Sequence, residues 1–327
     1  WLGLPLALLL GSMAATAVAG AFGLHFGGHA PAVPQKWRYV LVPVIGVAIG
    51  ASFPPDFASQ VMTWGVTILA LLVFIPLAQF IGYQMFTRLG GLTPPTAYFA
   101  AMPGGFIEAL EMGEKHGADM PMLIMLQFLR LILCIVLIPI GFSIFEGHAV
   151  GSGAGFSNGP HNPLTAWDVV VMLALGAGGW FIAHRLNFPA AVLSGPLLLS
   201  GVAHAFGLTE AVPPVWAVLV TQWVIGTSLG VRLVGFTRGE AGKALGLSVL
   251  NVGLMLLIAV AIALFAAEAV GEPVAAVILA FAPGGVSEMS LVALSLQLSA
   301  VYVTLHHLAR IILAVLVARV GLRLIGR

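Results

Sequence analysis

The chain has 327 residues, of which 60% are hydrophobic and only 8% are charged, and its mean hydropathy is +1.07. This composition excludes an ordinary soluble domain and indicates an integral membrane protein. A net charge of +1 without a basic tract gives no electrostatic basis for binding nucleic acid. The single cysteine, Cys134, supports neither a disulfide framework nor a thiolate metal site.

Uncharged apolar runs predict nine membrane crossings. The expected spans are Leu2–Leu24, Tyr39–Phe53, Val61–Met85, Pro121–Phe145, Trp167–His184, Phe188–Leu208, Val215–Val231, Ala244–Ala267 and Ala300–Leu322. The first of them lacks the basic start of a signal peptide, so we interpret it as a true span.

Two short segments are too short to cross and contain helix breaks. Pro103-Gly104-Gly105-Phe106-Ile107-Glu108 is repeated 180 residues later as Pro283-Gly284-Gly285-Val286-Ser287-Glu288, and at the same offset Arg130 returns as Arg310. Proline removes a backbone donor and glycine permits non-helical backbone, so each segment predicts a broken helix.

An internal duplication covers nearly the whole chain. Its pairs include Pro5 with Pro189 and Gly46 with Gly226. We expect a first membrane repeat at 1–150, a linker at 151–165 and a second repeat at 166–327. Trp167–His184 has no counterpart in the first copy, so we expect the native chain to carry one more helix upstream.

Loop charges predict that the two copies have opposite orientations. The signs alternate from loop to loop within each copy and are opposite between equivalent loops of the two copies. The four loops of the first copy carry, in order, Lys36 and Arg38; Asp56; Arg88; and Glu146. The equivalent loops of the second copy carry Glu210; Arg238 and Lys243; Glu268 and Glu272; and Arg319, Arg323 and Arg327. The positive-inside rule then requires re-entrant breaks, with Trp1 outside and Arg327 inside. The predicted fold is an all-α polytopic membrane protein, an inverted repeat with two broken, re-entrant helices, as in many transporters.

The breaks contain the first group of predicted substrate-binding residues. Free amides at the start of a helix bind anions, which points to Gly104, Gly105, Gly284 and Gly285; the alternative is that these glycines serve close packing only. One turn later, a carboxylate could be a helix-terminal charge or a proton or cation site. Those carboxylates are Glu108 and Glu288, and Ser287 is a further polar residue beside them.

The second group lies on the spans that follow the breaks. Arg130 and Arg310 each need a partner in an apolar span, and by register we expect pairs with Glu108 and Glu288. The alternative is that each arginine clamps a carboxylate or phosphate of the solute. If the solute takes an arginine, the released Glu, Glu288 in particular, could take up a proton.

Further polar residues complete the prediction. Gln127 and His307 share a helix face with the arginines, and His307 is a pH-sensitive, pore-facing or simply packed residue. The adjacent His306 and His307 point about 100° apart on a helix, which is poor geometry for one metal. No metal site or cofactor is expected. Polar residues of other spans that could line the same cavity are Asn251 and Gln222.

These motifs resemble the bacterial membrane AbrB family, whose hallmark is a duplicated membrane unit. The resemblance rests on Ala101–Gly105, Gly117–Asp119, Gln127–Arg130, Leu193–Leu197, and Pro283–Gly285 with Arg310. His306-His307 and Leu298-Ser299 depart from the family pattern. The family is associated with regulation of gene expression and with a putative ammonia monooxygenase label.

The predicted function is secondary transport of a small, anionic solute, coupled to protons or sodium, with the site between the two repeats. The alternative is an AbrB-type membrane regulator without transport activity. We expect no enzyme, because a membrane monooxygenase needs clustered ligands and the nine histidines are scattered. The expected partners are a small molecule or ion and the lipid bilayer, with a homo-oligomer left open. The expected location is the bacterial inner (plasma) membrane.

Overall fold

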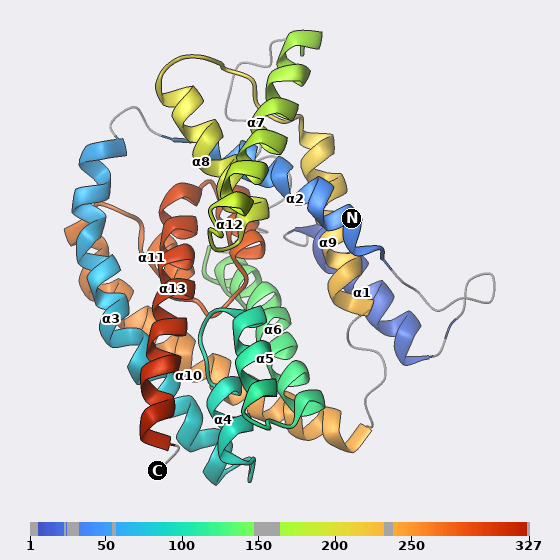
Figure 1. The fold of residues 1–327 in the computed structure, drawn as a ribbon, viewed down its shortest axis with the longest axis vertical. Coiled ribbons are helices and arrows are strands. Elements are labelled where there is room, and N and C mark those ends of the chain that lie inside the picture. The colour runs from blue at the N-terminus through green and yellow to red at the C-terminus, as the bar shows by residue number, and fades with distance from the viewer. Residues whose placement is uncertain are drawn as a thin grey trace. The chain divides into compact units, whose positions relative to one another are not determined.

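The computed structural model describes residues 6–22, 24, 33–53, 57–146, 164–231 and 238–325. Within these ranges the chain forms thirteen α-helices and no strand, which confirms the all-α prediction (Figure 1). The helices are α1 Ala7–Ala21, α2 Gln35–Gly50, α3 Phe57–Arg88, α4 Pro94–Ala100, α5 Phe106–Lys115, α6 Met120–Glu146, α7 Ala166–Arg185, α8 Ala191–Ala205, α9 Val215–Val231, α10 Arg238–Val270, α11 Val274–Phe281, α12 Val286–Ser295 and α13 Ala300–Ile325. Most of the predicted linker, 151–163, lies outside the described residues.

Five of these helices, α3, α6, α7, α10 and α13, are long and apolar enough to cross a membrane, which indicates a membrane protein. The other four predicted spans form α1, α2, α8 and α9, which have 15 to 17 residues. Their membrane crossing stays a prediction. Several boundaries were wrong: α2 begins at Gln35, so Lys36 and Arg38 lie in its first turn and not in a loop. Likewise α10 begins at Arg238, so Arg238 and Lys243 lie in a helix and not in the loop before it.

The chain divides into two compact units, and each draws on both halves of the sequence. Unit 1 comprises residues 1–60, 138–234 and 286–304, and unit 2 comprises 61–137, 235–285 and 305–327. The segment of unit 2 that contains the second break ends at Gly285, and the following helix, α12, belongs to unit 1. The repeat boundaries predicted at 150 and 166 stay a prediction.

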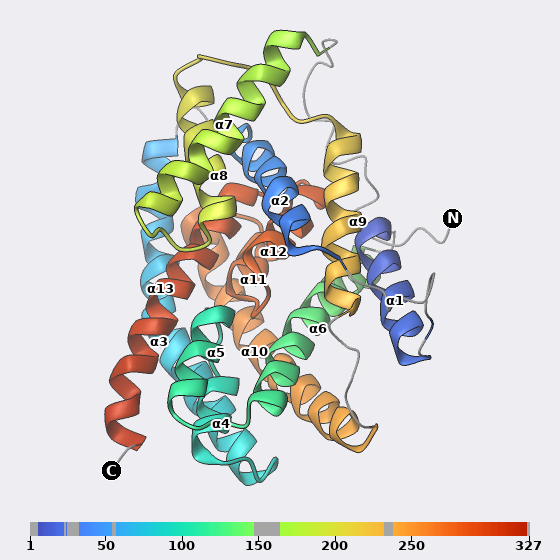
Figure 2. The ribbon, with the colours of Figure 1, turned by 45° about the vertical axis from the view of Figure 1, so that its right-hand side comes forward.

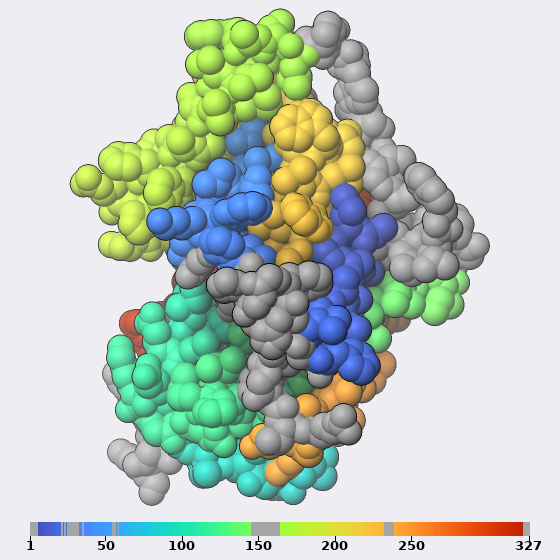
Figure 3. All heavy atoms as spheres, turned by 90° about the vertical axis from the view of Figure 1, so that its right-hand side faces the viewer, coloured from blue at the N-terminus to red at the C-terminus, as the bar shows by residue number. Residues whose placement is uncertain are grey.

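In unit 1 the two copies contact one another through equivalent residues. Helix α2 packs on α8. Helix α9 packs on α1 (Figures 2 and 3). A Cβ atom placed on Gly46 would lie 2.6 Å from the carbonyl oxygen of Leu193, and one placed on Gly226 would lie 2.2 Å from that of Leu9. Only glycine permits such close approach of two helix backbones. The contacts are reciprocal, as in an isologous interface.

The duplication also extends to backbone conformation. The residue before α1, Leu6, and the residue before α8, Ala190, both adopt the left-handed conformation with φ of 49°. This conformation is uncommon for residues with a side chain. Its recurrence directly after Pro5 and directly after Pro189 supports the predicted pairing of these two prolines.

Unit 2 holds the short helices that precede the breaks against longer ones. The Tyr98 hydroxyl of α4 donates to the carbonyl oxygen of Ala318 on α13, at 3.0 Å. The ring of Phe281 on α11 meets Phe74 of α3 edge to face, with the centroids 5.3 Å apart. These contacts fix where α4 and α11 end, and hence where the breaks lie.

Candidate functional site

Both predicted breaks are present. The chain leaves α4 at Ala100 and re-enters a helix at Phe106, and it leaves α11 at Phe281 and re-enters at Val286. Gly105 takes the left-handed conformation with φ of +70°, which a side chain would strain. Each short helix therefore ends in the protein interior with carbonyl groups that its own turns cannot pair.

In the first copy, α6 supplies donors to these carbonyl groups. Gln127 donates from Nε2 to the carbonyl oxygen of Phe99 at 2.6 Å, and Arg130 donates from Nη1 to that of Met102. Both side chains are almost completely buried. A cation at a helix C-terminus also complements the helix dipole, so Arg130 stabilises the end of α4 in two ways.

The second copy repeats this arrangement 180 residues later. His307 donates from Nε2 to the carbonyl oxygen of Leu279 at 2.9 Å, and Arg310 donates from Nη1 to that of Ala282. Arg310 also donates from Nη2 to the carbonyl oxygen of Gly284 at 2.6 Å. The predicted duplication therefore includes the hydrogen bonds around the breaks.

The bonds of His307 determine which of its nitrogens carries the proton. Nε2 faces the carbonyl of Leu279 and must be the donor, so Nδ1 accepts from Nη2 of Arg310, at 3.0 Å. A doubly protonated ring has no lone pair for Arg310. The network therefore holds His307 as the neutral tautomer, which argues against the predicted pH-sensitive role.

The predicted pairing of arginine with glutamate was wrong. No carboxylate of the described residues lies within 4.0 Å of the guanidinium of Arg130 or Arg310. The ends of the broken helices compete for the same donors, and backbone carbonyls at those ends have no other partner in lipid. The arginines therefore bind backbone where the sequence pattern favoured side chains.

One donor of each arginine is unused. Nε of Arg130 and Nε of Arg310 are buried without a hydrogen-bond partner, as is Oε1 of Gln127. Two buried positive charges without a counter-charge are costly, and each unpaired buried donor calls for a ligand or water.

The first break lies directly against the arginine of the second copy. A Cβ atom placed on Gly104 would lie 3.4 Å from Nε of Arg310, and one placed on Gly105 would lie 3.5 Å from Val315, also on α13. Among the described residues the amides of Gly104 and Gly105 donate no hydrogen bond, and no side chain caps α5. This confirms the predicted free amides at the first break.

The second break differs. The amide of Gly284 donates to the carbonyl oxygen of Ala282 at 2.8 Å, so the prediction of a free amide is wrong there. Gly285 follows it, before α12 begins at Val286. Among the described residues the amide of Gly285 donates no hydrogen bond, so the second break keeps one free glycine amide. The first break keeps two, at Gly104 and Gly105, and also has Nε of Arg310 beside it, within unit 2.

Glu288 and Ser287 belong to a separate cluster in unit 1, where α12 packs against α2. The carboxylate of Glu288 lies 3.6 Å from the guanidinium of Arg38 and accepts from the Ser287 hydroxyl at 2.9 Å. Glu288 is buried and Arg38 is about one quarter exposed. Arg38 was missed as a partner because the sequence pattern placed it in a loop.

The remaining polar residues have their own positions. His306 contacts the hydroxyl of Thr67 at 2.9 Å. Asn251 is buried in unit 2 beside Gly82, and Gln222 is buried in unit 1. Gln79, on α3, was not singled out from the sequence, although its Oε1 is also buried without a partner.

Comparison with known proteins agrees with this architecture. The family described as "Transition state regulatory protein AbrB" matches residues 8–326. The protein YhjN of Bacillus subtilis (strain 168) is 23% identical over 298 residues, which cover 86% of this chain and 77% of YhjN. A protein of Escherichia coli (strain K12) named "Putative regulator AbrB" is 21% identical over 246 residues, covering 74% of this chain and 67% of that protein. The chain belongs to the AbrB family.

Proposed function

We propose that this protein is a secondary transporter of a small anionic solute in the bacterial inner membrane. The observation that carries the proposal is the free Nε of Arg310 beside the unpaired amides of Gly104 and Gly105, at the uncapped start of α5. Backbone amides and the helix dipole favour an anion at that place. Arg310 adds a full positive charge next to it.

The charge balance supports an anion in preference to a cation or a neutral solute. Arg130 and Arg310 are both buried, and no carboxylate of the described residues lies within 4.0 Å of either. A bound carboxylate or phosphate would supply the missing negative charge and accept from Nε–H. Charged groups inside membrane proteins are costly and mark solute or ion pathways.

The transport mechanism rests on the inverted repeat predicted from loop charge. The duplicated breaks and the reciprocal packing of α1 with α9 and of α2 with α8 support a two-fold relation between the copies. An axis in the membrane plane would place the copies in opposite orientations, as alternating access requires. Cysteine accessibility in a Cys134-free background tests this: labelling from outside at Arg238, or from inside at Glu268, would contradict it.

Ligand-dependent thermal shift tests anion binding. Purified protein is heated with sodium salts of acetate, succinate, citrate, phosphate or sulfate at constant ionic strength. An anion that binds the folded state raises the thermal midpoint, by roughly 2.7 kcal/mol of stabilisation at one hundred times its Kd. We expect at least one salt to do so in the wild type and not in Arg310→Lys. No shift with any salt would refute the proposed site.

The alternative function is a membrane regulator, which the name of the Escherichia coli relative favours. A regulator that senses an anion would bind it without moving it. Uptake of the binding anion into proteoliposomes therefore separates the two functions. Uptake that stops in Gly104→Val supports transport, whereas binding without uptake supports a sensor.

A further inference from the structure

Glu108 lies at the proposed anion site itself. A Cβ atom placed on Gly105 would come 3.2 Å from Oε2 of Glu108, so this carboxylate folds back over the start of its own helix. It is partly buried, and among the described residues it has no ion pair. It is therefore the negative charge that resides where a solute anion would bind.

The equivalent carboxylate of the second copy is in the opposite situation. Glu288 is held by the guanidinium of Arg38 and the hydroxyl of Ser287. Arg38 lies on α2, and the residue 180 positions later, on α9, is Val218. The duplication therefore repeats the carboxylate but not the cation. Of the two matched carboxylates, Glu288 has an ion pair and Glu108 has none among the residues that the structure describes.

This asymmetry has a consequence for binding. A solute anion at Arg310 and the amides of Gly104 and Gly105 would meet the carboxylate of Glu108 at the same helix terminus. Two like charges at one site disfavour one another, and protonation of a carboxylate removes the repulsion. The proton comes from hydronium in solution: an O–H bond of hydronium breaks and one forms on the carboxylate, which leaves water and a neutral carboxylic acid.

We propose that Glu108 is the coupling residue: it occupies the first break as the resident anion and takes up one proton when the solute binds. This inference rests on the proposed transport function and identifies its coupling ion as the proton. It also reverses the expectation from sequence, which assigned proton uptake to Glu288. The physical reason is that Glu288 already has a counter-charge in Arg38, whereas Glu108 has no ion pair among the described residues.

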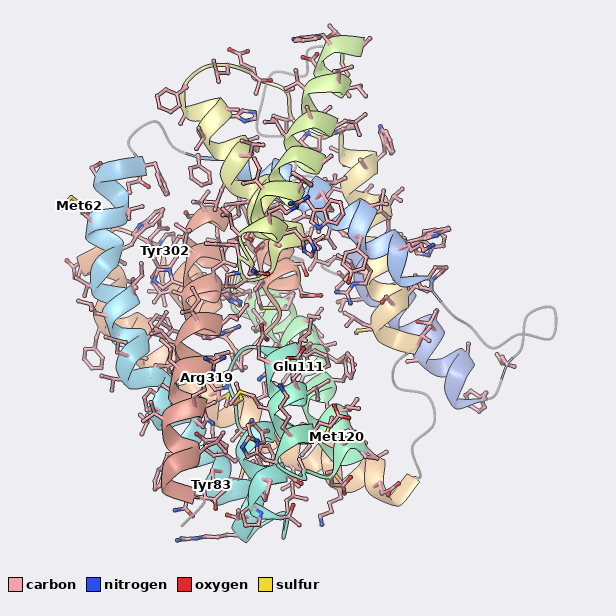
Figure 4. All side chains as sticks on the ribbon, in the orientation of Figure 1. Met62, Tyr83, Glu111, Met120, Tyr302 and Arg319 are labelled. Carbon is pink, nitrogen blue, oxygen red and sulfur yellow. The ribbon has the colours of Figure 1, made fainter. Side chains whose placement is uncertain are left out.

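Other groups near α5 could contribute to a pH dependence, so the test must separate them. On the helices that pack against α5 or its N-terminal residue, the described groups are Tyr98 on α4, Arg130 and Cys134 on α6, and Tyr302, His306, His307, Arg310 and Arg319 on α13; α5 itself carries Glu111, Glu114 and Lys115. Glu111 is exposed, one turn after Glu108, and provides a matched control (Figure 4).

The experiment uses the purified full chain and succinate, acetate or inorganic phosphate, whichever gives the largest thermal shift in the wild type. Proton uptake on addition of that anion is measured in weakly buffered solution, and Kd is measured across pH. We expect one proton per anion in the wild type, and a Kd that rises about tenfold per pH unit where Glu108 is ionised.

In Glu108→Gln we expect the anion to bind with a Kd that no longer depends on pH and without proton uptake. Glu108→Asp retains a titrating group at the same helix terminus and should restore uptake. Glu111→Gln and Glu288→Gln should behave as the wild type. Thermal unfolding of each variant in the absence of anion shows that it is folded.

Two results would overturn the inference while leaving anion transport intact. One is anion binding by the wild type without proton uptake. The other is uptake that persists in Glu108→Gln or disappears in Glu288→Gln. If neither these three anions nor citrate and sulfate bind the wild type, the proposed anion site fails, and the coupling role of Glu108 fails with it.

Discussion

Arg310 donates a hydrogen bond from Nη2 to Nδ1 of His307, at 3.0 Å, one turn earlier on α13. Because the other ring nitrogen binds the end of α11, this bond orients Arg310 and leaves its Nε–H as the unused donor. His307 is thus a positioning residue for the arginine, and its counterpart Gln127 binds the end of α4 without contacting Arg130 through Oε1.

Replacing His307 separates positioning from proton transfer. In His307→Gln the amide can make the carbonyl bond that Gln127 makes, so we expect the fold and the proton uptake to remain. His307→Leu leaves the Leu279 carbonyl unpaired and should cost about 1–3 kcal/mol of unfolding free energy. Thermal unfolding and proton uptake measure both. Loss of uptake in His307→Gln would show that the ring carries the proton after all.

Arg310→Lys should weaken anion binding at least tenfold. Lysine keeps the charge but cannot reproduce a planar fork that reaches the carbonyls of Ala282 and Gly284 while presenting Nε–H. Arg319→Lys, at an exposed position of the same helix, is the matched control and should bind as the wild type (Figure 4). Titration of the thermal midpoint with anion gives the Kd of each; equal values would exclude the guanidinium from the site.

Substitutions of Gly104 should discriminate a ligand site from a packing site. A Cβ atom there would be in ordinary contact with Arg310, and the backbone has no positive φ, so Gly104→Ala should fold. Gly104→Val adds two methyl groups against the arginine and should abolish anion uptake into proteoliposomes while the protein still inserts. Wild-type uptake in the valine variant would indicate that the glycine serves packing only.

The reciprocal helix contacts of unit 1 predict unequal responses to the same substitution. Gly226→Ala forces a Cβ atom against the Leu9 carbonyl and should destabilise the protein by about 1–3 kcal/mol through overpacking. Gly11→Ala has open space and should be neutral or stabilising by up to about 1 kcal/mol, because alanine favours the helix. Thermal midpoints compare the two variants. Equal effects would contradict the close approach of α1 and α9.

Much of the fold followed from the sequence, because its determinants are local. Apolar runs predicted the helices, Pro103 and Pro283 predicted the breaks, and a constant offset predicted that Arg130 and Arg310 play matched roles. The sequence did not show that α2 begins before Lys36 and Arg38, because the position of a helix end depends on neighbouring helices as well as on its own residues.

The sequence by itself determined that the chain is a duplicated helical membrane protein with two broken helices, each followed by a buried arginine. Only the tertiary structure decided the partners: Gly104 meets Arg310 of the other copy, Glu288 pairs with Arg38, and Glu108 has no ion pair within the described part of the chain. The spacing of residues along the chain suggested arginine–glutamate pairs within one copy. In the folded protein the partners come from helices that are distant in sequence, and unpaired carbonyls at the ends of the short helices compete with the carboxylates for the same arginines.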